Sequence, residues 1–271
     1  MSTIAELLRA SGLAAVDARV LLRYALGVDD VYLIAHAGDT VDEPLATKFR
    51  ALVARRAAGE PVAYITGERE FYGHAFTVSP AVLIPRPETE LLVELALERL
   101  SRDASGTVLD LGTGSGCIAI SIALARPAAR VIACDRSAAA LAVARENAAR
   151  LNTRNVVLLA SDWFAALHER FDVIVANPPY VAIGDVHLTQ GDLRFEPPSA
   201  LATGGDGFAE LRAIIHHAPT HLTSGGWLLL EHGHTQELRC RELLRDAGFV
   251  NVQSWRDLAG IERVSGGRAA V

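Results

Sequence analysis

The residues best suited to chemistry are Asn177-Pro178-Pro179-Tyr180, which follow the apolar run 171–176. The run predicts a buried strand, and the two prolines predict that the chain then leaves the sheet, since neither has a backbone N–H. The Asn177 side-chain oxygen and the Pro178 carbonyl are two acceptors at one spot, which suits a planar –NH2 group with two hydrogens to donate. Tyr180 can pack on the flat face of that group. The alternative is a proline-rich loop in which Asn177 only caps a turn.

A glycine-rich turn lies earlier in the chain, where residues 107–111 predict a strand and 117–125 a helix. Glycines at 112, 114 and 116 let a ligand approach the backbone closely. The nicotinamide fingerprint requires Gly or Ala at 117, where this sequence has Cys117. Asp110 adds a carboxylate, which would repel a pyrophosphate and attract an ammonium group. The turn therefore favours S-adenosylmethionine over NAD, unless Asp110 only holds the loop by a hydrogen bond.

Two further carboxylates follow predicted strands. Asp135 ends the second strand, about twenty residues beyond the glycines, where a carboxylate accepts hydrogen bonds from ribose hydroxyls in either cofactor class. Asp162 and Trp163 follow the third strand. Asp162 can accept from an adenine amino group and Trp163 can stack on the ring. The alternative is that Ser161 and Asp162 cap a helix while Trp163 belongs to the core.

These residues need a sheet whose strand ends meet at one edge. From residue 106 onward strands and helices alternate, which predicts a mostly parallel sheet with helices on both faces. The predicted strands are 107–111, 130–135, 156–160, 171–176, 226–231, 250–254 and 262–266, the last two forming a closing hairpin with one antiparallel strand. The predicted helices are 117–125, 137–151, 208–218 and 236–247, and an amphipathic helix is predicted before the first strand, from about residue 88 to residue 100. Residues 1–66 predict a separate helical domain and 67–86 a hairpin linker, so the sheet domain spans 87–271.

The composition excludes several classes of protein. Half of the 271 residues are hydrophobic, which is enough for a substantial core. The net charge of −6 argues against non-specific binding to the nucleic-acid backbone. Three scattered cysteines predict neither a disulfide framework nor a zinc site, and they fit a reducing cytoplasm. No leader peptide or membrane span is expected, and no metal site.

The combination of motifs resembles a known family. Asp110-x-Gly112-x-Gly114-x-Gly116, Asp135 and the Asn177 tetrapeptide together resemble class I S-adenosylmethionine-dependent methyltransferases that modify amide or amine nitrogen. Further segments narrow the resemblance to the release factor glutamine methyltransferase family, over nearly all 271 residues. They are residues 70–73, 83–90 and 195–197, Ala200-Leu201, residues 204–207 and Leu230-Glu231-x-Gly233.

The resemblance implies a seven-stranded class I methyltransferase domain behind an N-terminal helical domain. It implies methyl transfer to N5 of the glutamine in the Gly-Gly-Gln motif of bacterial peptide chain release factors, which affects translation termination. By position, the cofactor contacts would be Gly112, Thr113, Gly114, Ser115, Gly116, Asp135, Trp163 and Asn177, with Asp110 and Asp162 added by the reasoning above. Asn177, Pro178, Pro179 and Tyr180 would hold the glutamine, with Asn177, Pro178 and Tyr180 in catalytic roles.

Arg86, between two prolines, is a further candidate for substrate binding, and the alternative is a salt bridge to Glu88 or Glu90. We expect a cytoplasmic monomer that binds a protein substrate and neither nucleic acid nor membrane.

Four other functions stay open. A related enzyme methylates a ribosomal protein, and an adenine-N6 DNA methyltransferase uses the same tetrapeptide on a flipped base. A nicotinamide-dependent oxidoreductase is disfavoured by the glycine spacing and by Asp110. A binding module without catalysis would share the fold alone.

Overall fold

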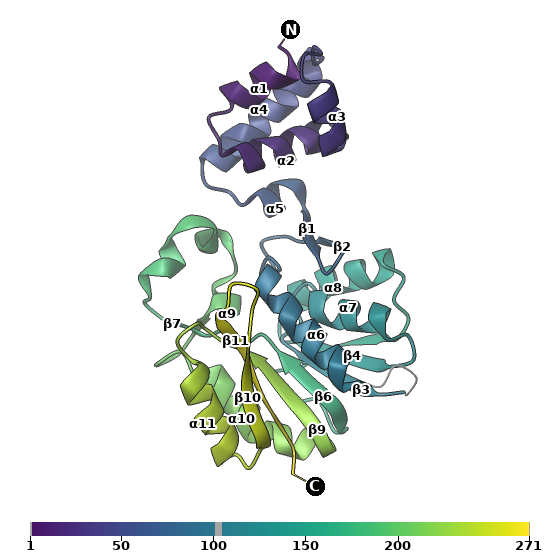
Figure 1. Ribbon diagram of the computed structural model, residues 1–271, viewed down its shortest axis with the longest axis vertical. Coiled ribbons are helices and arrows are strands. Elements are labelled where there is room, and N and C mark those ends of the chain that lie inside the picture. The colour runs from purple at the N-terminus through teal and green to yellow at the C-terminus, as the bar shows by residue number, and fades with distance from the viewer. Residues whose placement is uncertain (1, 101–104, 271) are drawn as a thin grey trace. The chain divides into compact units, whose positions relative to one another are not determined.

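The structure is a computed structural model that describes residues 2–100 and 105–270 (Figure 1). The chain forms two compact units, residues 1–68 and residues 69–271. All three tryptophans, Trp163, Trp227 and Trp255, belong to the second unit.

The first unit is a small helical bundle. Its helices are α1 (Ile4–Ala10), α2 (Ala15–Leu26), α3 (Asp30–Ala35), α4 (Glu43–Ala57) and α5 (Val62–Thr66). The side chain of Thr3 accepts from the Glu6 amide and the side chain of Glu6 accepts from the Thr3 amide, so a capping box fixes the start of α1. Leu21, Leu22 and Phe49 are buried in a core that the helices share.

The second unit is built on a seven-stranded sheet in the order β10-β11-β9-β6-β3-β4-β5. Its strands are β3 (Thr107–Leu111), β4 (Arg130–Asp135), β5 (Val156–Ala160), β6 (Phe171–Ala176), β9 (Leu222–Glu231), β10 (Val250–Arg256) and β11 (Glu262–Arg268). The strand β11 runs opposite to the other six strands of this sheet. The predicted fold, a mostly parallel seven-stranded sheet that ends in an antiparallel hairpin, is confirmed.

Alternate residues of each central strand enter two different cores, one on each face of the sheet. Val173 and Val175 of β6 pack with α6 (Glu90–Arg99) and α7 (Cys117–Ala125), whereas Ile174 and Ala176 pack with α10 (Ala209–His221) and α11 (Glu237–Asp246). Figure 1 shows these helix pairs on opposite sides of the sheet. Burial on both faces explains why the central strands are continuous apolar runs.

The structure contains short elements that the sequence patterns did not predict. They are the 3-10 helices η2 (Val186–Thr189) and η3 (Gly191–Phe195), the helix α9 (Pro198–Leu201) and the paired strands β7 (Val181–Ala182) and β8 (Ala202–Thr203). The helix predicted from about residue 88 begins instead as a 3-10 turn, η1 (Pro87–Thr89), which leads into α6. Helix α10 was predicted to end at Ala218 but continues through Pro219 to His221. Pro219 lies in its last turn, where only one intrahelical N–H is lost.

The hairpin of β1 (Glu68–Phe71) and β2 (His74–Thr77) is anchored in the second unit. Phe71 and Phe76 are buried in the same core as α6 and α7. Asn147, on α8 (Ala138–Arg150), is fully buried and joins this hairpin to the glycine turn. Its Nδ2 donates to the carbonyls of Thr77 and Ser115, at 2.9 Å each, and its Oδ1 accepts from the Thr77 amide at 2.7 Å.

Replacing Asn147 by Ala should destabilise the second unit by about 2–4 kcal/mol, because three buried backbone groups lose their partners. Urea unfolding followed by tryptophan fluorescence measures this effect, since all three tryptophans lie in that unit. Arg145→Ala, at an exposed position of the same helix, is the matched control and should leave the midpoint nearly unchanged. Equal midpoints for Asn147→Ala and the control would contradict the prediction.

Candidate functional site

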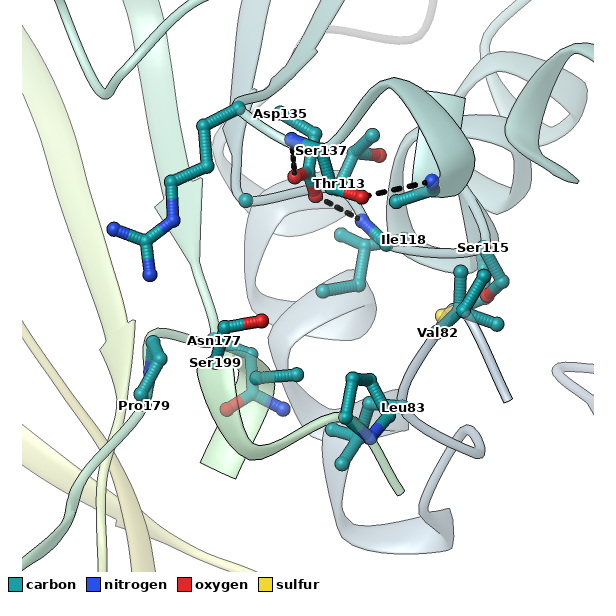
Figure 2. Close-up of a pocket in the computed structure, with 18 of the residues that line it drawn as sticks. Val82, Leu83, Thr113, Ser115, Ile118, Asp135, Ser137, Asn177, Pro179 and Ser199 are labelled. Carbon is teal, nitrogen blue, oxygen red and sulfur yellow. Dashed lines mark hydrogen bonds between the residues drawn. The ribbon is translucent and has the colours of Figure 1, made fainter. Parts of the chain in front are cut away.

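A cavity opens at the carboxyl ends of β3, β4, β5 and β6, with about 940 Å³ of empty space when its solvent-open part is included. Ligands of open α/β sheets bind at this edge. The walls come from six stretches of chain: residues 81–89, the glycine turn with the start of α7, the ends of β4 and β5, the segment after β6, and residues 197–200 at the start of α9. Figure 2 shows Asp135, Ser137 and Thr113 on one side of the cavity, and Asn177, Pro179 and Ser199 on another.

The glycine turn is held by the neighbouring strand and exposes backbone to the cavity. The amides of Gly112 and Thr113 both donate to the Cys134 carbonyl at 2.9 Å. Gly114 has a positive φ of 55°, and a Cβ there would meet nothing within 4 Å, so the cavity approaches this backbone directly. Gly116 is different, because it is buried at the start of α7 and a Cβ would meet Ile120 at 2.9 Å. Gly116 does not line the cavity, and the packing of α7 requires a residue without a side chain at this position.

Asp135 connects the turn to α8. One oxygen accepts from the Gly114 amide at 2.9 Å and the other from the Ser137 amide at 2.8 Å. Figure 2 shows Asp135 beside Ser137. Each carboxylate oxygen has a second lone pair, so the group can accept further hydrogen bonds from a ligand. Asp135 is half-buried and lines the cavity.

Asp110 is fully buried beneath the turn and does not line the cavity. Oδ2 accepts from the Thr113 hydroxyl at 2.6 Å, and Oδ1 has no hydrogen-bond partner among the described residues. Burial raises the pKa of Asp110 to about 7, and the nearby Asp135 adds to the rise while Thr113 opposes it. Asp110 can therefore act on a ligand through Thr113 and through its charge, not by direct contact.

The turn after β5 presents both residues expected there. Asp162 is exposed and Trp163 half-buried, and both line the cavity. Trp163 has a positive φ of 45°, and its ring would lie 3.3 Å from a Cβ on Gly112. Its Nε1 donates to Glu210 at 2.7 Å, so the ring is held in one orientation.

The Asn177 tetrapeptide contributes only part of its length to the cavity. Asn177 and Pro179 line it, whereas Pro178 is buried and Tyr180 lies outside the wall. The Tyr180 backbone carbonyl accepts from Gln236 Nε2 at 3.2 Å. Burial, with the nearby charge of Glu231, raises the pKa of Tyr180 above its usual value, so its hydroxyl stays neutral.

Gln236 has every hydrogen-bonding group of its amide occupied. Nε2 also donates to the Gly207 carbonyl at 3.3 Å, and Oε1 accepts from the Gly233 amide at 2.9 Å. The amide thus ties the tetrapeptide to two glycine-containing turns. A Cβ on Gly207 would lie 2.8 Å from the Tyr180 carbonyl, so only glycine fits there.

Arg86 lines the cavity and pairs with neither Glu88 nor Glu90. Its guanidinium donates to Glu196, whose other oxygen accepts from the Ile84 amide at 3.1 Å. Glu196 is 3% exposed, and burial raises its pKa despite the opposing charge of Arg86. The pair joins the segments before α6 and before α9, which face each other across the cavity.

Four residues with site contacts were not singled out from the sequence as site residues: Thr89, Glu196, Glu231 and Gln236. Glu196 and Glu231 stood inside motifs that carried the family resemblance. A charged residue at the end of a buried apolar strand, as Glu231 ends the predicted strand 226–231, was the available indication. Within the described parts of the chain no cluster of three His, Cys, Asp or Glu residues could hold a metal ion. None of the described helices is long and apolar enough to cross a membrane.

Asp110→Asn should change how stability depends on pH. A carboxyl whose pKa rises on folding from 3.8 to about 7 stabilises the fold fully only below the lower value. Relative to the variant, the wild-type chain should lose up to roughly 4 kcal/mol of unfolding free energy between these two values, and no more above the higher one. Urea unfolding by tryptophan fluorescence across this range measures the difference, with exposed Asp246→Asn as the baseline. A difference independent of pH would contradict the expectation.

Two family profiles match the chain. The profile described as "PrmC N-terminal domain" covers residues 1–67, and "Methyltransferase small domain" covers residues 88–208. A solved methyltransferase from Pyrococcus furiosus superposes with a TM-score of 0.56 at 19% identity, over 80% of this chain and 98% of that one. A 16S rRNA N2 G1207 methyltransferase of T. Thermophilus, solved with AdoMet and guanosine, gives 0.54 at 23% identity, over 74% and 49%. At these identities the similarity concerns the fold.

Sequence relatives are much closer. The release factor glutamine methyltransferase of Burkholderia pseudomallei is 54% identical over 98% of this chain and 96% of its own length. The proteins of the same name from Bordetella pertussis and Pseudomonas aeruginosa are 53% identical, over 98% and 99%, and 47% identical, over the whole of both chains. With both profiles matched and identity spread over nearly its whole length, the chain belongs to the release factor glutamine methyltransferase family.

Proposed function

We propose that this enzyme transfers the methyl group of S-adenosylmethionine to N5 of the glutamine in the Gly-Gly-Gln motif of bacterial peptide chain release factors. The observation that carries the proposal is the position of Asn177. This amide lies on the wall of the cavity that also exposes the glycine turn and Asp135. The Asn177 side chain can thus accept a hydrogen bond from a substrate nitrogen beside a site that suits S-adenosylmethionine.

The residues of the cavity fit the cofactor. When bound, S-adenosylmethionine supplies an electrophilic methyl, which leaves sulfur as the nitrogen attacks, and the product amide then loses one proton. Asp135 retains acceptor capacity for ribose hydroxyls after its two amide contacts. The open face of Gly114 gives a backbone that a ligand can approach. In its ionised form, Asp110 places negative charge behind Thr113, which favours an ammonium group over a phosphate.

The substrate side of the cavity has to help a poor nucleophile, because an amide nitrogen shares its lone pair with the carbonyl. As the new bond forms, positive charge grows on this nitrogen. The Asn177 side-chain oxygen would accept one of its hydrogens, stabilise the charge and direct the lone pair toward the methyl. Pro179 and Arg86, which line the cavity, would bound the substrate. Pro178 and Tyr180 do not line it, so their proposed contacts, through the Pro178 carbonyl and the Tyr180 ring, would require the substrate to reach past the cavity wall. No strong base is needed, since an N-protonated amide is very acidic.

Asn177→Ala should lower kcat by roughly 10²-fold or more, by analogy with the loss of one oxyanion-hole donor. Cofactor binding should persist, because most of the cavity wall is unchanged. Single-turnover transfer of labelled methyl to a release factor measures the effect. Normal turnover by Asn177→Ala would refute the assigned mechanism.

Asp135→Ala should raise the KM for S-adenosylmethionine more than it lowers kcat, because its assigned hydrogen bonds to ribose are the same in the ground state and the transition state. Steady-state kinetics with saturating release factor separate the two parameters. A large fall in kcat with an unchanged KM would show that the ribose assignment is wrong.

A protein substrate of this size should touch both parts of the chain. We assign residues 1–66 as a substrate-docking domain, 67–86 as the connecting hairpin and 87–271 as the methyltransferase domain, acting as a monomer in the cytoplasm. The loop 183–200 is a candidate contact, since its Ile183 and Val186 are exposed apolar residues. The net charge of −6 disfavours a nucleic-acid substrate.

The deciding experiment offers labelled S-adenosylmethionine with three acceptors in parallel: release factor, ribosomal protein and duplex DNA. Label on release factor that disappears when its Gly-Gly-Gln glutamine is replaced supports both reaction and target. Label on either of the other acceptors would transfer the function to the corresponding rival. Cofactor binding without label on any acceptor would refute the proposed substrate.

A further inference from the structure

Glu231 is a buried carboxyl group at the end of β9 for which the proposed mechanism has no role. Glu231 is 2% exposed, and its Oε2 has no hydrogen-bond partner among the described residues. A buried polar atom without a hydrogen-bond partner lowers the stability of the fold, and more so when it is charged, so the presence of Glu231 here calls for a reason.

The sheet register places Glu231 beside Asn177. Ala176 of β6 pairs with Leu230 of β9, so the next residue of each parallel strand lies at the same level. Asn177 follows the alternation of Val173 and Val175, which face α6. Glu231 follows that of Leu229 on the same face. Both side chains therefore lie on the α6 side of the sheet edge.

Thr89, at the start of α6, completes a small polar cluster with these two residues. Asn177 Nδ2 donates to Thr89 Oγ1 at 3.3 Å. Burial raises the pKa of Glu231 to about 7, while hydrogen bonds from the side chains of Thr89 and Asn177 act against that rise. Thr89 and Asn177 line the cavity and Glu231 does not, so the carboxyl stands behind them.

An asparagine amide has two ends of nearly equal shape and opposite hydrogen-bonding character. If Nδ2 faced the substrate, one donor would meet another and the acceptor pair would be lost. The orientation of the amide is set by its hydrogen-bonding neighbours. Thr89 cannot set it, because a hydroxyl both donates and accepts. An ionised carboxylate only accepts, so it selects the orientation in which Nδ2 points away from the cavity.

We propose that Glu231 is a positioning residue that holds Nδ2 of Asn177, so that Oδ1 is the atom presented to the substrate amide. This inference rests on the proposed function, since it explains how the acceptor is kept in place. The carboxylate acts only through Asn177 and does not touch the substrate.

The first experiment compares Glu231→Gln in two backgrounds, with methyl transfer to release factor as the readout. In the wild-type background kcat should fall about 10-fold, as a charge-assisted hydrogen bond is replaced by an amide that can bond to either end of Asn177. The KM for S-adenosylmethionine should stay within about 2-fold, because the walls assigned to cofactor are untouched. Glu169→Gln, from an exposed pair with Arg130, is the matched control.

The second background is Asn177→Asp, whose side chain presents an oxygen in both orientations. Here Glu231→Gln should leave kcat unchanged or raise it, since orientation no longer matters and a repulsion between two carboxylates is removed. A purely structural role for Glu231 would lower kcat by the same factor in both backgrounds, and that result would overturn the proposal. If wild-type enzyme does not methylate release factor at all, the proposed function fails, and the following measurement decides the positioning role alone.

The side-chain amide of Asn177 can be observed directly by nitrogen–proton NMR of the free protein, with its resonance assigned by its loss in Asn177→Ala. In the wild-type chain this resonance should shift with pH as Glu231 titrates, and Glu231→Gln should abolish the shift. The other charged groups that act on Glu231 are Glu88 from η1 and Arg263 from β11, and their effects oppose each other. An Asn177 resonance that does not respond to pH, or responds equally in Glu231→Gln, would overturn the proposal even where activity is low.

Discussion

Two carboxyl groups are buried at the carboxyl edge of the sheet, and the site depends on keeping them there. Asp110 and Glu231 each have one oxygen without a hydrogen-bond partner among the described residues, and burial raises the pKa of each to about 7. Two hydrophobic cores, one on each face of the sheet, offset this cost through the apolar area they bury. Natural sequences accept such local conflicts mainly at functional sites. Here the two groups stand behind the two halves of the cavity, Asp110 behind the glycine turn and Glu231 behind Asn177.

The sheet and most of its helices could be predicted because the residue pattern within each segment is enough to indicate its secondary structure. The runs 107–111, 130–135, 156–160 and 171–176 were predicted with the bounds that the structure shows. Each run is apolar on both faces and followed by glycine, proline or a polar residue, which is the pattern of a buried parallel strand. The short elements between residues 181 and 203 were missed because their conformation depends on contacts with distant segments. Glu196, for example, fixes that region through Arg86 and the Ile84 amide.

The site residues proposed from the sequence reach the cavity only in part. Ten of the proposed site residues line the cavity: Arg86, Gly112, Thr113, Gly114, Ser115, Asp135, Asp162, Trp163, Asn177 and Pro179. Asp110, Gly116, Pro178 and Tyr180 do not. Sequence spacing locates a residue along the chain, but whether it reaches a cavity depends on which side of the turn it faces. Gly116 illustrates the limit, since its glycine is required by the approach of Ile120 and α8 and not by a ligand.

Gln236 and Glu231 both support the Asn177 tetrapeptide, but they differ in their effect on stability. Gln236 has a structural role, whereas the role proposed for Glu231 is functional. Gln236 is a neutral amide whose Nε2 and Oε1 both have hydrogen-bond partners, so it fixes backbone positions without leaving a buried polar group unpaired. Glu231 has an unpaired oxygen and a raised pKa, so it contributes less to stability than an apolar side chain of similar size would. A carboxyl group that lowers stability at this position calls for another explanation, which is the side-chain orientation that it selects. An acceptor-only carboxylate specifies the direction of the Asn177 amide, which an apolar side chain or a hydroxyl cannot do.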